Sequence, residues 1–200
     1  MNVERYDILR KTLSVNLDVT NEQWATIAGY FKPLTAKRNE ILLEKGKVSQ
    51  YMYFIAKGCL RILLIDDAGQ EATRFLLFEG QIGTAFPSFI LRQPSKASIQ
   101  CIEPCELLII SYGDYQQLIE EMPGWETMTR LNLESAYIDA IERIESLITM
   151  DARERYDILL KQNPRIVQRL PNKFVADYLG ISQETLSRLK TGKSGSRKSG

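Results

Sequence analysis

Histidine is absent from all 200 residues. A histidine-ligated zinc or haem site is therefore excluded, and so is the side chain that most often acts as a general base. The absence of histidine also argues against hydrolase triads and cupin-type metal sites. Because the sequence also has no nucleophile motif and no cluster of metal-ligating residues, we do not expect an enzyme.

Long apolar runs are also missing. No stretch approaches the roughly 20 apolar residues that span a bilayer, and charges interrupt the N-terminal segment MNVERYDILRKTL, which differs in this from a signal peptide. We therefore expect a cytoplasmic protein without a membrane partner.

Cysteine is scarce, with three residues in strand-like sequence: Cys59, Cys101 and Cys105. An odd number of cysteines in such a sequence favours buried thiols over a disulfide framework. A redox pair of Cys101 and Cys105 is the alternative.

Charge is divided unevenly along the chain. Residues 151–200 hold 11 Lys and Arg against 5 Asp and Glu, a net charge of +6. Residues 1–150 hold 15 against 20, a net charge of −5, so the formal +1 of the whole chain conceals an acidic body and a basic end. Phosphate binding is expected at the basic end.

The basic end contains the most informative segment, residues 172–190, NKFVADYLGISQETLSRLK. Its apolar residues recur at helical spacing, Gly180 can form a tight turn, and Ser182 can cap a second helix. Four polar side chains that can hydrogen-bond to base edges remain on the open face of that helix: Gln183, Glu184, Ser187 and Arg188. The segment predicts a DNA-reading helix-turn-helix, with an ordinary helical hairpin as the alternative.

The rest of the chain predicts helices followed by a barrel. Residues 2–31 have helical spacing, with Thr20 or Asn21 as a cap. From Glu40 onward short β-rich runs follow, closed by evenly spaced glycines: Gly46, Gly58, Gly69 and Gly80. This spacing predicts an antiparallel barrel or jelly roll. The fold class is therefore α+β: an antiparallel β jelly-roll barrel, a long helix and a small C-terminal helical domain.

The long helix is expected from Trp125 to about Met150, where Gly and Pro are absent. A 4-3-4 spacing, which is typical of a helix–helix seam, joins Tyr137, Ile141, Ile144 and Ile148. Further apolar residues widen the stripe, so packing within its own domain is the alternative. We favour a parallel homodimer, because two helix-turn-helix units together read a palindromic site.

This order of parts resembles the Crp/Fnr family of bacterial transcription regulators. The resemblance covers nearly the whole chain and rests on SQYMYFIAKGCLRILLIDDAGQE and FEGQIG in the barrel, the helix YIDAIERIESLI and the terminal LGISQETLSRL. It implies a cyclic-nucleotide-binding-like barrel and a homodimer that binds double-stranded DNA, with RNA polymerase as a further partner if it activates. Within the family, FEGQIGTAFPSF resembles the variants from Bacteroidetes-type bacteria.

The resemblance also implies residue roles in DNA binding. Three residues match the base-reading positions of the family: Gln183, Glu184 and Arg188. Arg188 can bind O6 and N7 of guanine, Glu184 can accept from a cytosine amine, and Gln183 favours adenine. The expected phosphate contacts are Ser182, Thr185, Ser187 and Lys190.

The barrel departs from the cyclic-AMP-binding members. Those members place a Glu for the ribose after the second glycine of the cassette, and an Arg followed by Ser or Thr for the cyclic phosphate. Here the second glycine is Gly83, and the matching positions hold Thr84, Ser95 and Lys96. A lysine is a point charge without the guanidinium fork. We therefore expect an unidentified small-molecule effector in place of cyclic AMP, or a dimer controlled by its abundance.

The predicted domains are a barrel with N-terminal helices (1–122), a dimerisation helix (123–150), a helix-turn-helix domain (151–190) and a flexible basic tail (191–200). Family members usually add a β-hairpin wing, whereas the tail TGKSGSRKSG is rich in Gly and Ser, with cations that could follow the DNA backbone. The alternative function is an effector-binding module that acts through a protein partner without binding DNA.

Overall fold

The computed structural model describes residues 2–15, 17–122 and 124–192. The chain divides into two compact units, Met1–Ser135 and Ala136–Gly200. The first unit contains α1 (Asn2–Leu13), α2 (Asn21–Tyr30), β1 (Lys32–Ala36), β2 (Ile41–Leu43), β3 (Tyr51–Lys57), β4 (Leu60–Ile65), β5 (Glu71–Leu77), β6 (Ile82–Gly83), α3 (Phe86–Leu91), β7 (Ala97–Cys101), β8 (Cys105–Ser111) and α4 (Tyr112–Glu121). Helix α5 (Trp125–Thr149) begins in the first unit and ends in the second.

The strands form two four-stranded antiparallel sheets with the orders β1-β8-β3-β6 and β2-β7-β4-β5. Ile55 and Leu107 of the first sheet share a buried core with Ile62 and Ile99 of the second. Apolar side chains on facing strands are what a two-layer β structure must bury. The predicted mixed fold with an antiparallel jelly-roll barrel is therefore confirmed.

Helices cover the outer face of the first sheet. Because side chains alternate along a strand, Phe54 and Leu108 point away from the core between the sheets and pack with Leu9, Ile27 and Trp125 in a second buried cluster. This two-sided burial explains why β3 is buried at five successive positions. The same cluster contains the start of α5.

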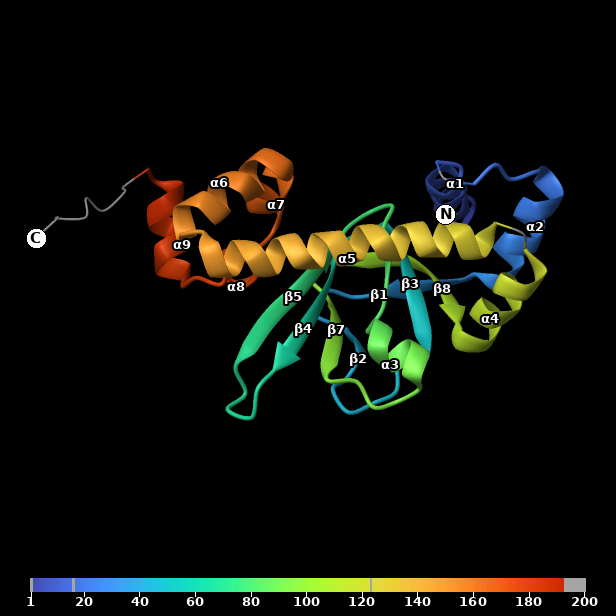
Figure 1. Cartoon of the computed structure of the whole chain (residues 1–200), viewed down its shortest axis with the longest axis horizontal. Coiled ribbons are helices and arrows are strands. Elements are labelled where there is room, and N and C mark those ends of the chain that lie inside the picture. Colours follow the sequence, from blue (N-terminus) through green and yellow to red (C-terminus); the bar gives the residue numbers. More distant parts are fainter. Residues whose placement is uncertain (1, 16, 123, 193–200) are drawn as a thin grey trace, which may run out of the picture. The chain divides into compact units, whose positions relative to one another are not determined.

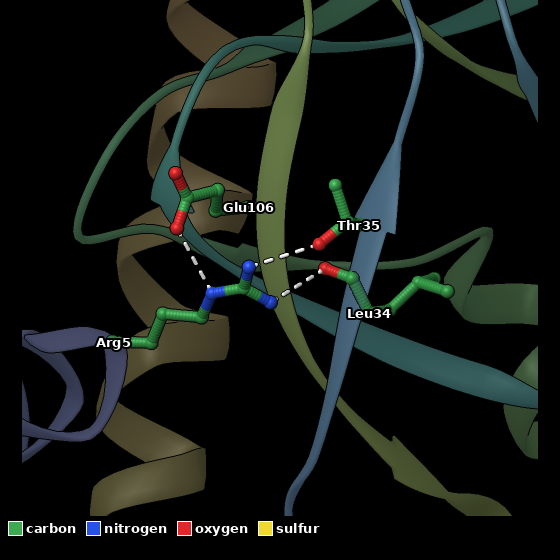
Figure 2. A network of polar contacts seen from close by, with 4 residues as sticks. All are labelled: Arg5, Leu34, Thr35 and Glu106. Atoms are coloured by element: carbon green, nitrogen blue, oxygen red, sulfur yellow. Dashed lines mark hydrogen bonds and ion pairs between the residues drawn. The ribbon is translucent and has the colours of Figure 1, made fainter. Parts of the chain in front are cut away.

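A buried arginine fastens α1 to the first sheet. Arg5 is 4% exposed, and its Nε donates to Glu106 Oε2 of β8 at 3.0 Å. Its two terminal nitrogens donate to the Leu34 carbonyl oxygen at 3.1 Å and to Thr35 Oγ1 at 2.9 Å in β1 (Figure 2). Each nitrogen of the Arg5 guanidinium has a partner, so this one side chain joins α1 to β1 and β8.

Thr20, one of the two predicted caps of the second helix, forms a cap, and further caps and turns are formed by nearby side chains. Thr20 caps α2 in a capping box with Gln23, and Ser111 Oγ accepts from the Asp114 backbone N–H at the start of α4. In the β4–β5 turn, Asp66 Oδ1 accepts from two backbone N–H groups and Gly69 has a φ of +80°. The long helix ends at Thr149 rather than at Met150, and α3, α6 and α7 were not predicted.

The three cysteines are buried thiols, as expected. The hydrogen bond between the Cys101 and Cys105 thiols and then burial raise the pKa of Cys101. A Cβ at Gly58 would lie 2.6 Å from the Cys105 sulfur, so the chain approaches the thiols closely there. The same thiol–thiol hydrogen bond lowers the pKa of Cys105, so Cys105 has more thiolate character than Cys101.

The second unit contains the end of α5 together with α6 (Ala152–Gln162), α7 (Pro164–Arg169), α8 (Asn172–Leu179) and α9 (Gln183–Lys190). These four helices gather around the C-terminal part of α5 (Figure 1). Their small core includes Tyr156, Leu159, Ile166, Val175 and Leu186. Among the described helices, none has the length and apolarity that a membrane span requires.

Candidate DNA-reading surface

The turn between α8 and α9 is built on Gly180. This residue has a φ of +67°, and its N–H is directed at the Ala176 and Asp177 carbonyls, while the Ile181 N–H donates to the Ala176 carbonyl at 3.0 Å. A left-handed residue that closes a helix in this way is most often glycine. A Cβ here would also lie 3.2 Å from Leu147 Cδ2 of α5, so both conformation and space favour glycine.

Helix α9 begins at Ser182 and is held by apolar residues. Ser182 Oγ accepts from the Thr185 backbone N–H at 3.1 Å, which is the predicted N-cap. Leu186 is fully buried and Leu189 is half-buried. The helix is thus fixed along one side, and its opposite side faces away from the core of the unit.

The predicted base-reading residues lie on that open side. Gln183, Glu184 and Arg188 are exposed, as is Ser187 between them. Within the described part of the chain, Arg188 makes one hydrogen bond, a long one of 3.3 Å from Nη2 to Thr185 Oγ1. Its remaining donors are therefore available to an acceptor outside the protein, such as a guanine edge.

The predicted phosphate-contacting residues differ in how many of their hydrogen-bonding groups are already engaged within the protein. The hydroxyls of Ser182 and Thr185 are 3.0 Å apart and bond to each other. Lys190 Nζ donates to Asn172 Oδ1 at 2.6 Å and to the Val167 carbonyl at 3.2 Å. Lys190 therefore ties α9 to the neighbouring helices, and only part of its donor capacity is left for phosphate.

Two arginines that sequence reasoning missed hold the helix-turn-helix. Arg155 of α6 donates to the Leu179 carbonyl at 3.0 Å and to the Met150 carbonyl at 2.6 Å, so it binds the last carbonyls of α8 and of the α5 region. The Arg143 guanidinium lies 4.0 Å from the centre of the Tyr178 ring. Burial lowers the pKa of Arg143. Charge alone would have grouped Arg155, which lies in the basic end, with the DNA-binding cations.

The apolar stripe of α5 stays uncovered. Tyr137, Ile141, Ile144 and Ile148 are 69%, 37%, 52% and 78% exposed. Leu133, Ile138 and Leu147 are exposed beside them. Packing within the second unit therefore does not bury Tyr137, Ile141, Ile144 and Ile148, and a continuous apolar stripe of this kind is typical of an interaction surface.

The four predicted effector residues differ in their surroundings. Thr84 and Ser95 are buried and hydrogen-bonded within the protein, and Gly83 lies against Leu77. Lys96 is exposed and borders a cavity of about 380 Å³ on the side of the β4–β5 hairpin. That cavity is lined by Lys45, Leu64, Ile65, Asp66, Gln70, Glu71, Ala72 and Lys96. The hydroxyl donors that the cassette offers at Thr84 and Ser95 are thus already bonded within the protein.

The predicted flexible tail, residues 191–200, falls outside the described residues from position 193 onward. Thr191 and Gly192 continue from α9, with the Thr191 and Gly192 N–H groups donating to the Ser187 and Leu189 carbonyls. The cations expected to follow the DNA backbone in the tail stay a sequence prediction.

The barrel region is similar in sequence to a known domain family. Residues 33–122 match the family model of the cyclic nucleotide-binding domain. The cAMP-activated global transcriptional regulator CRP of Salmonella typhimurium is 24% identical over 160 residues, which cover 74% of this chain and 75% of the relative. Residues 33–122 therefore resemble a cyclic nucleotide-binding domain.

Solved structures extend the likeness beyond this domain. The catabolite activator protein of Thermus thermophilus covers 86% of this chain and 83% of its own, with 25% identity and a TM-score of 0.56. FixK2 from Bradyrhizobium japonicum covers 81% and 83%, with 14% identity and a TM-score of 0.71, and shows the shared fold. These likenesses in sequence and in fold bear out the resemblance to the Crp/Fnr family that the sequence predicts. The Bacteroidetes type stays a prediction.

Proposed function

We propose that this chain is a sequence-specific DNA-binding transcription regulator that acts as a homodimer. The observation that carries the proposal is the open face of α9, where Gln183, Glu184 and Arg188 are exposed on a helix fixed from behind. The relative from Salmonella typhimurium is itself a global transcriptional regulator. Side chains of these types on an exposed recognition helix are suited to the major groove.

Each of the three residues has a distinct role in the proposed readout. Arg188 binds O6 and N7 of a guanine, Glu184 accepts from a cytosine amine, and Gln183 pairs with an adenine. Ser182, Thr185 and Ser187 contact phosphates, which set the register of the helix without reading sequence. Lys190 contributes less than its charge implies, because Asn172 and Val167 already accept from its Nζ.

The exposed stripe of α5 supports the homodimer. A single copy would leave Tyr137, Ile144 and Ile148 largely in water, whereas a second copy of the same helix would cover them in a parallel seam. Two α9 helices related by a two-fold axis read two half-sites one helical turn apart. Because one dimer binds both half-sites, its affinity for DNA is far higher than that of a single α9 helix.

Selection from random double-stranded DNA tests the proposal. The full chain is incubated with the DNA pool at near-physiological salt, and the retained DNA is sequenced. We expect an enriched palindrome whose half-site centres are about 10 base pairs apart. A chain with both Gln183→Ala and Arg188→Ala is the matched control and should retain DNA without that motif.

Two results would contradict the proposal. Retention without any motif would mean that the chain binds the DNA backbone only, and absence of retention would favour an effector-binding module that acts through a protein partner. Sedimentation of the same preparation at several concentrations separates a failure of DNA reading from a failure of dimerisation. Involvement of RNA polymerase would be examined afterwards on the selected site.

A further inference from the structure

A chain of buried hydroxyl groups surrounds the start of α3. Thr84 Oγ1 donates to the Tyr51 carbonyl at 2.8 Å and lies 2.9 Å from Ser49 Oγ. The backbone N–H of Ser49 donates to Ser88 Oγ at 3.0 Å, and Ser88 Oγ donates to the Gln93 carbonyl. All three hydroxyl side chains belong to buried residues, so these bonds are sheltered from water.

Arg92 closes the other end of α3. Its Nη1 donates to the Ser49 carbonyl at 2.7 Å and to the Phe89 carbonyl at 3.2 Å, and its Nη2 donates to Gln50 Oε1 at 2.6 Å. The guanidinium also lies 4.4 Å from the centre of the Tyr112 ring. Arg92 has a φ of +54°, which is uncommon for a residue other than glycine. Several contacts thus compensate for one unfavourable backbone conformation.

The same loop before β3 also holds the segment that follows α3. The Ser95 N–H donates to the Lys47 carbonyl at 2.9 Å, and the Gly46 N–H donates to the Ser95 carbonyl at 2.7 Å. Ser95 Oγ donates to the Ala97 carbonyl at 2.8 Å and accepts from the Ala97 N–H at 3.0 Å. The Ser95 hydroxyl therefore uses its one donor hydrogen and one acceptor lone pair within the protein.

The cassette also lacks room beside its glycine. A Cβ at Gly83 would lie only 2.4 Å from Leu77 Cδ1, which shows that the leucine side chain covers this glycine directly. A cyclic phosphate needs donors that face an open space, and ideally a guanidinium fork. Here Thr84 and Ser95 have internal partners, Leu77 covers Gly83, and Lys96 points to the cavity on the hairpin side.

We infer that the cassette is closed by its own side chains. Ser49, Thr84, Ser88 and Arg92 hold α3 in one fixed position, as a bound ligand would, and the barrel takes no cyclic mononucleotide. The domain is then a rigid scaffold that needs no cyclic mononucleotide to be ordered. The consequence for regulation rests on the proposed function: DNA binding by this chain is independent of cyclic AMP and cyclic GMP.

Titration calorimetry of the unmodified chain with cyclic AMP and with cyclic GMP is the first test. We expect no saturable heat at nucleotide concentrations up to about 1 mM, and no change in the melting temperature of the first unit. A nucleotide present at one hundred times its Kd would raise that temperature by roughly 5–10 °C. Saturable binding of either nucleotide would overturn the inference. Because DNA is not used here, failure of the DNA-binding proposal would leave the result unaffected.

Hydrogen exchange tests the positive half of the inference. Thr84→Val removes one hydroxyl at nearly constant shape, and we expect amide protection at residues 86–92 to fall about tenfold relative to the rest of the first unit. The matched control is Thr35→Val in β1, whose hydroxyl accepts from Arg5, away from α3. That variant should leave the relative protection of residues 86–92 unchanged. Unchanged protection in Thr84→Val as well would show that the hydroxyl chain does not hold α3.

Discussion

The two units of this chain use their polar and apolar side chains in opposite ways. In the first unit, the polar side chains at the predicted effector positions, Thr84 and Ser95, are buried and bonded to the protein. In the second unit, Gln183, Glu184 and Arg188 remain exposed on α9. Polar side chains at the predicted sites therefore stabilise the fold in the first unit and are left exposed for a partner in the second.

Apolar side chains show the same contrast. The outward face of the first sheet is covered by helices, whereas the stripe of α5 within the second unit is open. An exposed apolar stripe costs free energy unless a second molecule covers it. Substitutions in the first unit should therefore change stability, and substitutions on the open faces of the second unit should change assembly or DNA reading.

Disruption of the α5 stripe should have the largest effect. Ile144→Glu places like charges opposite each other in the seam, so we expect monomers. Affinity for a palindromic site should fall on the order of 100-fold or more, because the second half-site contact is lost. Sedimentation and DNA titration measure the two effects. Ile158→Glu replaces an exposed isoleucine of α6, outside the stripe, and should remain dimeric. A dimeric Ile144→Glu would mean that another surface joins the copies.

Removal of the Arg5 guanidinium should have the next largest effect. Arg5→Met retains the apolar stem but leaves the Leu34 carbonyl, Thr35 and Glu106 without their shared donor. We expect a loss of about 2–3 kcal/mol in the free energy of unfolding, because loss of one partner leaves the others desolvated and unpaired. Both tryptophans of the chain, Trp24 and Trp125, lie in the first unit, so urea denaturation followed by fluorescence reports on that unit.

Lys11→Met on the same helix is the matched control for Arg5→Met. Lys11 is exposed, so its loss should change the free energy of unfolding by less than about 0.5 kcal/mol. The site preference on DNA should be the same in both variants. Equal stability of the two variants would show that the buried network of Figure 2 adds nothing to the first unit.

Removal of Arg188 should alter DNA reading and leave stability unchanged. Arg188→Ala is expected to cost about 1–3 kcal/mol at one guanine in each half-site and to relax the preference there. Lys161→Ala removes another exposed cation of the second unit and should weaken all sequences alike, if it weakens any. Binding to a panel of single-base site variants distinguishes the two. A uniform loss in Arg188→Ala would leave it as a phosphate contact only.

The features that were predictable from the sequence are those set within a few residues. The Thr20–Gln23 box, the Ser111 and Ser182 caps and the turn at Gly180 each depend on side chains and backbone within one helical turn. The exposed face of α9 was predictable for the same reason, since helical spacing decides which side chains share a face.

Most of the features that were missed depend on residues far apart in the sequence. Helix α6 is an exception, because its capping box of Asp151 and Glu154 is local. Arg5 and Glu106 are separated by 101 positions, and Arg155 and Leu179 by 24. Helix α3 is only six residues long and its N-cap residue, Ala85, forms no side-chain cap, so it has little local signal. Lys190 was expected on phosphate because its charge is visible in sequence, whereas its bonds to Asn172 and Val167 are not.

Loss of the exposed ion pair between Arg130 and Glu134 of α5 should have the smallest effect on stability. It tests whether burial or contact distance decides what an ion pair contributes. Arg130 Nη1 lies 2.6 Å from Glu134 Oε1, closer than Arg5 is to Glu106, yet both side chains are more than half exposed. Water and salt screen such a pair, so Arg130→Ala should cost about 0.3–0.5 kcal/mol in the free energy of unfolding at low salt and less at 1 M salt. A cost equal to that of Arg5→Met would mean that contact distance, rather than burial, decides what a polar contact contributes to the first unit.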